Sequence, residues 1–318
     1  NPPHELKTVI IQDNDSLKNL CEKLKSVEWI ALDTETTSTD PMAADMVGIS
    51  LSYQNGEGYY IPVGHRDNTP QLFPAEIQKY LGPILLNPKI KKVGHNLKYD
   101  MLILRRHGLP VVPASFDTMV AAFLVDPASH RIGLKDLAED LLNINMTHIE
   151  ELIGSGKNQR SMADVSVERA APYAAADAEV TLRLLHALQP ILEEKASTRL
   201  MDEIEMPLLP ILADMEQTGI SLDVNFLQTM SHELKKRLAE IEQEIHKQVG
   251  YPFNINSTQQ LSKALFSTLK LDPPDRKKTT ASGHFSTSAA VLDQLSGQHP
   301  IIDQILEHRE LSKLLSTY

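Results

Sequence analysis

The stretch that decides the fold reads Trp29-Ile30-Ala31-Leu32-Asp33-Thr34-Glu35. A short apolar run that ends in polar residues predicts a buried strand. Residues two apart in a strand point the same way, so Asp33 and Glu35 should face one side of a sheet. Burying two like charges together is costly unless a cation lies between them. An isolated Asp-x-Glu, however, is also typical of the polar end of an ordinary strand.

Other strand-like and helical runs surround this stretch. Met46–Tyr53 and Gly58–Val63 flank Asn55-Gly56, which is a hairpin signal, and Ile90–Val93 is a further strand candidate. Apolar spacing then predicts helices over residues 97–104, 114–124, 134–142 and 167–192, the last with Pro172 as a kink or a break. Strands come first and helices follow, so we expect an α/β domain with a mixed sheet.

The character of the sequence changes near residue 195. No later run is convincingly strand-like, while residues 201–215, 226–249 and 301–318 predict helices. Residues 271–288 are rich in Pro, Ser, Thr and Gly and contain Arg276-Lys277-Lys278, so they predict a surface loop. We expect two domains, residues 1–195 and 196–318. The chain does not begin with Met, and we expect it to be an excerpt of a longer protein.

Composition excludes several classes of protein. The net charge of −11 argues against a broad basic surface that coats nucleic acid, so any contact with nucleic acid must be local or assisted by metal ions. The one cysteine, Cys21, cannot form an internal disulfide, which fits a cytoplasmic protein. No apolar run approaches the roughly 18 residues of a bilayer span, and no signal-peptide pattern opens the chain. We expect no membrane partner.

Two further pairs of polar residues have helical spacing. Asn96 and Asp100 are four residues apart and should share a helix face, as should Tyr173 and Asp177. Each pair also has an ordinary explanation: Asn96 could cap a helix beside a solvated Asp100, and Tyr173 could be an amphipathic aromatic at a helix surface.

Together and in this order, the three pairs resemble the exonucleases that are named after their four acidic residues. The tyrosine and the intervals between the pairs are similar to those of the proofreading domain of bacterial family A DNA polymerases. The resemblance continues through Phe116-Asp117-Thr118-Met119 and Ser257-Thr258-Gln259-Gln260-Leu261 to His308-Arg309-Glu310-Leu311, so it covers effectively the whole chain.

The resemblance implies a ribonuclease H-like exonuclease domain followed by the thumb of a polymerase used in replication and repair, with palm and fingers absent from this chain. It implies 3′→5′ proofreading of DNA with release of 5′-mononucleotides. Asp33 would bridge two divalent ions, Glu35 and Asp177 would complete one shell, and Asp100 would hold the second ion. Carboxylates without a His or Cys cluster favour Mg²⁺ or Mn²⁺, and the resemblance also allows Zn²⁺ at one position. Tyr173, helped by Glu35, would orient the attacking water.

The resemblance also implies substrate contacts. Asn96 and Arg131 match positions that contact the terminal nucleotides, whereas Thr39 and His95 stand where an apolar wedge and a glutamine are familiar. In the thumb, Lys277, Lys278, Ser286 and Thr287 would bind phosphates of the primer–template duplex, although a merely solvated loop has the same composition. The partner would be DNA, as a single-stranded or frayed 3′ end or as duplex at the thumb, and we expect a monomer.

Two alternatives remain open at this point. One is a DNA-binding scaffold without catalysis, because some relatives have lost the carboxylates. The other is an RNA-trimming or repair exonuclease of the same superfamily, against which the thumb-like region speaks.

Overall fold

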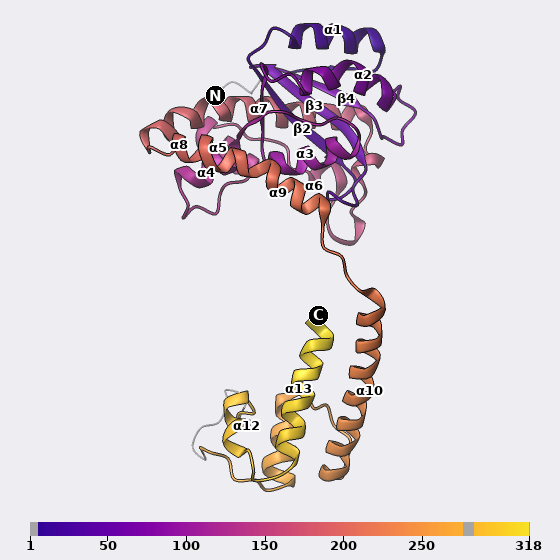
Figure 1. Cartoon of the computed structure of the whole chain (residues 1–318), viewed down its shortest axis with the longest axis vertical. Coiled ribbons are helices and arrows are strands. Elements are labelled where there is room, and N and C mark those ends of the chain that lie inside the picture. The colour runs from indigo at the N-terminus through magenta and orange to yellow at the C-terminus, as the bar shows by residue number, and fades with distance from the viewer. Residues whose placement is uncertain (1–5, 276–282, 318) are drawn as a thin grey trace. The chain divides into compact units, whose positions relative to one another are not determined.

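The structure is a computed structural model that describes residues 6–275 and 283–317. It divides into two compact units, Asn1–Gly219 and Ile220–Tyr318, which are drawn in Figure 1. No helix in the described part of the chain is both long enough and apolar enough to span a membrane. Each unit is described by itself below.

The first unit is built on one sheet of six strands among the described residues. The strands are β1 (Lys7–Ile10), β2 (Trp29–Thr36), β3 (Met46–Gln54), β4 (Glu57–Pro62), β5 (Lys91–Gly94) and β6 (Ala114–Asp117). Their order is β1-β4-β3-β2-β5-β6. The pairs β2–β3 and β3–β4 are antiparallel, and the pairs β1–β4, β2–β5 and β5–β6 are parallel. The prediction of a mixed sheet is confirmed, and β2 lies inside it.

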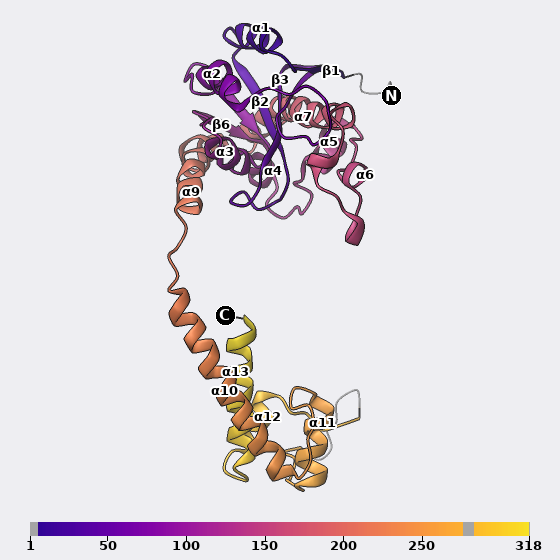
Figure 2. The same cartoon turned by 90° about the vertical axis from the view of Figure 1, so that its right-hand side faces the viewer.

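Helices cover the sheet on both sides. They are α1 (Asn14–Leu24), α2 (Pro74–Leu85), α3 (Leu97–Arg106), α4 (Thr118–Val125), α5 (Leu134–Leu142), α6 (Glu150–Ile153) and α7 (Val167–Glu194), with the short turns η1 (Gly156–Asn158) and η2 (Met162–Asp164). Figure 2 shows α7 on one side of the sheet and α2 and α3 on the other. The helix α7 is continuous through Pro172, so the predicted break does not occur there, and a local kink stays a prediction.

The helix predicted over residues 114–124 is wrong in its first turn. Residues 114–117 form the edge strand β6, which pairs with β5, and the helix α4 begins only at Thr118. Asp117 ends the strand and caps the helix by accepting hydrogen bonds from the backbone N–H groups of Met119 and Val120. Pairing with a neighbouring strand, which the local sequence does not reveal, overrides the helical spacing here.

Small residues let α7 lie close to the sheet. A Cβ atom added to Gly58 in β4 would lie 2.6 Å from the carbonyl oxygen of Ala175 and 2.8 Å from its Cβ. Such distances are too short for any larger pair, so the helix backbone and the strand approach as closely as glycine and alanine allow. Ala175 lies between Tyr173 and Asp177, and this packing therefore sets the height of both side chains above the sheet.

The expected change near residue 195 does not coincide with the division between the compact units. The helix α8 (Thr198–Leu200), the π-helical turn η3 (Met201–Glu205) and the helix α9 (Met206–Thr218) belong to the first unit. Met201, Met206 and Leu209 are buried in its core. Assignment of residues 196–318 to a polymerase domain stays a prediction, but their first 24 residues pack with the sheet-containing unit.

The second unit is helical in its described part, as the sequence predicts. It contains α10 (Val224–Val249), α11 (Thr258–Ser262), η4 (Lys263–Thr268), α12 (Ala289–Leu295) and α13 (Ile301–Thr317). Ile241 and Ile245 of α10 pack with Ile302 and Ile305 of α13 in a separate core.

A single buried carboxylate joins the starts of two helices in the first unit. The Oδ1 atom of Asp117 accepts hydrogen bonds from the N–H groups of Asn96, Met119 and Val120, and its Oδ2 atom accepts one from Leu97 at 2.7 Å. Asp117 is 1% exposed, so these bonds form out of water. The start of α3 is thereby tied to the start of α4.

We expect Asp117→Ala to lower the free energy of unfolding of the first unit by about 2–4 kcal/mol, because buried N–H groups lose their acceptor. Asp13→Ala is the matched control, since Asp13 caps α1 in the same way but at the surface. Its loss should be clearly smaller. Urea denaturation followed by the fluorescence of Trp29, the one tryptophan in the chain, measures both. Equal losses would show that burial adds nothing to this cap.

Candidate nuclease site

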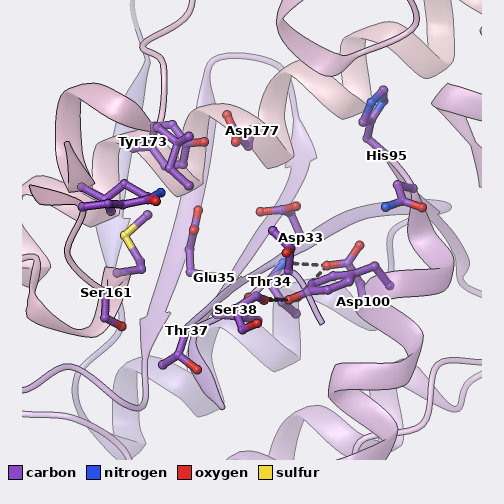
Figure 3. Close-up of a pocket in the computed structure, with 18 of the residues that line it drawn as sticks. Asp33, Thr34, Glu35, Thr37, Ser38, His95, Asp100, Ser161, Tyr173 and Asp177 are labelled. Atoms are coloured by element: carbon purple, nitrogen blue, oxygen red, sulfur yellow. Dashed lines mark hydrogen bonds between the residues drawn. The ribbon is translucent and has the colours of Figure 1, made fainter. Parts of the chain in front are cut away.

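Three carboxylates from distant parts of the chain converge beside the sheet. Asp33 and Glu35 extend from β2, and Asp177 extends from α7. One oxygen atom of each lies within 4.8 Å of the others. Figure 3 shows Glu35 and Asp33 on the strand with their carboxylates directed toward the helix that carries Asp177. The alternation of β2 thus places the two strand acids on the face that α7 covers.

The fourth acid, Asp100, is held by the residue between the two strand acids. Its Oδ1 atom accepts a hydrogen bond from the backbone N–H of Thr34 at 2.9 Å and another from the Thr34 hydroxyl at 2.6 Å. Asp100 is 2% exposed and lies on the first turns of α3. Figure 3 shows its carboxylate beside Asp33. The helix that Asp117 anchors is therefore also fixed to β2 at the site.

Proximity of these acids makes their ionised forms costly. Burial raises the pKa of Asp33 well above its usual range, and the nearby charges of Asp100, Glu35 and Asp177 raise it further. Burial followed by repulsion from Asp177 raises the pKa of Glu35 to about 8. Burial also raises the pKa of Asp100, although the hydrogen bonds from Thr34 oppose that change. In the absence of a cation, the raised pKa values favour protonated carboxyl groups in the cluster at neutral pH.

Lys135 and Tyr173 complete the immediate surroundings of Asp177. The ammonium group of Lys135, on α5, forms an ion pair with the Oδ1 atom of Asp177 and lies 4.4 Å from the centre of the Tyr173 ring. Burial raises the pKa of Asp177, and Lys135 and a hydrogen bond with Tyr173 lower it. Burial and the surrounding acids raise the pKa of the Tyr173 phenol, so the hydroxyl group keeps its proton at neutral pH.

The acids open into a cavity of about 740 Å³. Its other walls come from the loop after β2, from the start of α3 and from the segment before α7. The lining residues are Asp33, Thr34, Glu35, Thr36, Thr37, Ser38, Thr39, His95, Asn96, Tyr99, Asp100, Ile149, Ile153, Gln159, Arg160, Ser161, Met162, Tyr173 and Asp177. Hydroxyl and amide groups dominate this list, so the cavity suits a polar ligand.

The structure brings three of the predicted substrate residues to this cavity. Thr39, His95 and Asn96 all line it. The backbone of Asn96 is left-handed, with a φ of 59°, and its side chain makes no cap hydrogen bond. The ring of His95 shares a hydrogen bond of 2.9 Å with the Thr118 hydroxyl, and burial lowers its pKa to about 4. A neutral imidazole at that position can accept or donate a hydrogen bond without adding charge.

Arg131 is not brought into the cavity lining. Its guanidinium group is exposed and forms ion pairs with Asp136, Glu139 and Asp140 at 2.9–3.0 Å. A role of Arg131 in binding a nucleotide stays a prediction, and it requires the guanidinium group to leave these partners.

The predicted thumb contacts fall into two groups. Lys277 and Lys278 lie outside the described residues. Ser286 and Thr287 line a cavity of about 420 Å³ in the second unit. The Thr287 hydroxyl is buried and accepts a hydrogen bond from Arg309 at 3.3 Å, whereas Ser286 accepts one from the N–H of Ser288. Their contact with DNA stays a prediction.

Three residues in or beside the site were not predicted from the sequence: Tyr99 and Arg160 line the cavity, and Lys135 contacts Asp177. Tyr99 lies inside the Asn96–Asp100 motif, and its hydroxyl group donates a hydrogen bond to the Ser38 carbonyl oxygen at 2.5 Å, so the motif itself could have indicated it. Lys135 and Arg160 carry no such signal, because nothing in their local sequence places them near the acids.

The donor set fits hard divalent cations. Asp33, Glu35 and Asp177 offer three carboxylates within 4.8 Å of one another. A bound cation would favour their ionised forms and would therefore lower the raised pKa values of Asp33 and Glu35. Oxygen donors without thiol or imidazole groups favour Mg²⁺ or Mn²⁺. The expected site is thus chemically suited to the ions that the sequence suggests.

Comparison with known protein families decides the classification. A family model described as 3′–5′ exonuclease matches residues 8–193. The chain belongs to the 3′–5′ exonuclease family. A second model, described as DNA polymerase family A, matches residues 224–318. The exonuclease match contains β2, α3 and all of α7 except Glu194, and therefore all four acids of the site.

Curated relatives are bacterial DNA polymerase I proteins. The protein of Chloroflexus aurantiacus is 44% identical over 313 residues, which are 97% of this chain and 33% of the relative. That of Pseudomonas aeruginosa is 36% identical over 315 residues, which are 97% of this chain and 34% of the relative. The chain spans about a third of the length of these relatives.

A solved structure supports the fold. It is described as the POL domain of Pol1 from M. smegmatis in complex with DNA primer-template and dNTP. The match has a TM-score of 0.74 at 24% identity and covers 97% of this chain and 49% of that one. At this identity the match supports the fold alone.

We expect Asp33→Asn to be more stable than the wild type in EDTA, by about 1–3 kcal/mol of unfolding free energy, because one of the mutually repelling buried charges is gone. Saturating Mn²⁺ should reverse that order, since the wild type binds the ion more tightly. Melting followed by Trp29 fluorescence tests both statements, with Glu28→Gln at the surface as the control. A variant that is less stable in EDTA would contradict the charge repulsion described above.

Proposed function

We propose that the first unit hydrolyses the 3′-terminal phosphodiester of DNA and releases 5′-mononucleotides, as the proofreading part of a bacterial DNA polymerase I. The observation that carries the proposal is the convergence of Asp33, Glu35 and Asp177 beside Asp100 in one cavity. Membership in the 3′–5′ exonuclease family supports it.

Two divalent ions fit the proposal. Asp33, Glu35 and Asp177 would hold one ion, and Asp33 with Asp100 would hold the second. When bound, such ions lower the pKa of water and neutralise charge on the scissile phosphate. The same ions offset the acidity of the cavity, which would otherwise repel DNA. The four acids therefore determine where the two ions would bind.

Tyr173 is the proposed positioning group for the attacking water. Its phenol keeps its proton and forms a hydrogen bond with Asp177. The phenol oxygen can also form a hydrogen bond with a water molecule in the cavity. Glu35 lies within the same group of acids and can accept a proton from that water. A positioned phenol needs no change of charge during the reaction.

The residues that line the cavity suit the end of a DNA strand of any base sequence. Thr39, Asn96 and Ser161 offer hydroxyl and amide groups to phosphate or sugar, and Ile149 and Met162 offer apolar surface to a base. Contacts to the backbone position a strand, whereas base edges would be needed to specify it. A single-stranded or frayed 3′ end is the substrate that this arrangement favours.

The region matched by the family A polymerase model is proposed to hold the primer–template duplex in the longer parent protein. The M. smegmatis protein is described with primer-template DNA, and most of this chain matches it in fold. A monomer and a cytoplasmic location are part of the same proposal.

The two alternatives predict different outcomes. A scaffold without catalysis would bind DNA and leave it intact. An RNA-trimming enzyme would shorten RNA faster than DNA of the same sequence.

We expect the 318-residue chain to shorten a 5′-labelled single-stranded DNA in Mg²⁺ and to release 5′-mononucleotides. Asp33→Ala and Asp100→Ala should each lower the rate by roughly 10³-fold or more, because the cations lose carboxylate ligands. Glu28→Ala, which removes a surface acid, should retain the rate. Gel electrophoresis and chromatography of the products measure these rates. Undiminished activity in both site variants would falsify the assignment of this site.

Tyr173→Phe separates orientation from metal binding. We expect its turnover number to fall by about 10²-fold, because the water loses a hydrogen-bond partner. Stabilisation by Mn²⁺ should stay as in the wild type, since the four acids remain. A loss of Mn²⁺ stabilisation in this variant would show that the phenol supports the acids rather than the water.

A further inference from the structure

Lys135 reaches the acids from an element that no motif marks. It lies on the second residue of α5, which packs against α7, and its side chain is 22% exposed. The ammonium group forms an ion pair with the Oδ1 atom of Asp177, whose side chain is 10% exposed. This pair is therefore largely shielded from water. Opposite charges attract more strongly in such a shielded place than in water.

The influence of Lys135 extends beyond Asp177. Its positive charge opposes the rise in the pKa of Asp33, Glu35 and Asp177 that burial causes. An oxygen atom of Asp177 lies within 4.8 Å of oxygens of the other two acids. A cation at Asp177 is consequently close enough to act on the whole group.

Lys135 also contacts the residue proposed to position water. Its ammonium group lies 4.4 Å from the centre of the Tyr173 ring, within the range of a cation–π interaction. One cationic side chain thus links the oxygen of a proposed metal ligand to the ring of Tyr173.

We propose that Lys135 is a positioning residue that competes with a divalent cation for Asp177 and thereby sets how tightly the site binds metal. The inference rests on the proposed function, because it takes Asp177 as a ligand. An ion that binds Asp177 meets an ammonium group already in contact with the Oδ1 atom, and the two positive charges repel each other. The four-carbon stem of lysine lets the group swing aside, and each displacement costs the attraction that Lys135 had to the acids.

Lys135→Met tests the competition because methionine retains much of the stem and removes the charge. We expect this variant to bind Mn²⁺ at least about fivefold more tightly than the wild type. Lys135→Arg keeps the charge and should bind Mn²⁺ within about twofold of the wild type.

Lys91→Met is the matched control. Lys91 also combines an ion pair, with Glu28 at 3.1 Å, and a cation–π contact, 5.0 Å from the centre of the Trp29 ring. It is not among the charges that act on the site acids. Its Mn²⁺ affinity should equal that of the wild type.

Isothermal titration of each 318-residue variant with MnCl₂ measures the affinity, and a thermal melt in EDTA confirms that each variant is folded. Unchanged or weaker binding in Lys135→Met would overturn the competition, and so would equal gains in Lys135→Met and Lys91→Met. If Lys135→Met does not fold, Lys135→Gln replaces it, with the same expected direction. Failure of the proposed function is distinct: the wild type would then bind no more Mn²⁺ than Asp33→Ala.

Discussion

Repulsion between buried carboxylates that line one cavity is the constraint on which the rest of the first unit depends. Burial raises the pKa of Asp33, Glu35 and Asp177, repulsion between the acids raises those of Asp33 and Glu35 further, and Asp100 lies beside Asp33. A fold that only maximised stability would separate such groups. Their convergence therefore requires a rigid frame around them and a source of positive charge between them, and both are recognisable in the chain.

The frame consists of short, direct links between backbone and acid. Thr34 lies between the two strand acids and binds Asp100 with both its N–H group and its hydroxyl group, so β2 and α3 cannot move independently. Asp117 then fixes the start of α3 to that of α4. In this way, residues that are not ligands determine how far apart the ligands stand. The exonuclease family match spans all of these links.

The sequence predicts those features that arise from local spacing. The two-residue period of a strand and the four-residue period of a helix suffice to put Asp33 with Glu35 and Tyr173 with Asp177, and the order of the motifs indicates the family. Features that depend on contacts between distant segments were missed or mistaken. Residues 114–117 form a strand only because β5 lies beside them, and Lys135 approaches Asp177 from another helix. No local period encodes such meetings.

The close approach of Gly58 and Ala175 has a consequence for how this domain can change. Because α7 rests on the sheet through the smallest side chains available, a larger residue at either place would lift the whole helix rather than disturb one contact. Tyr173 and Asp177 would rise together, while Asp33 and Glu35 stayed on the strand. A substitution that adds no charge and contacts no ligand could therefore inactivate the site by moving the acids apart. Substitutions of Gly58 or Ala175 are thus as consequential as substitutions of the acids themselves.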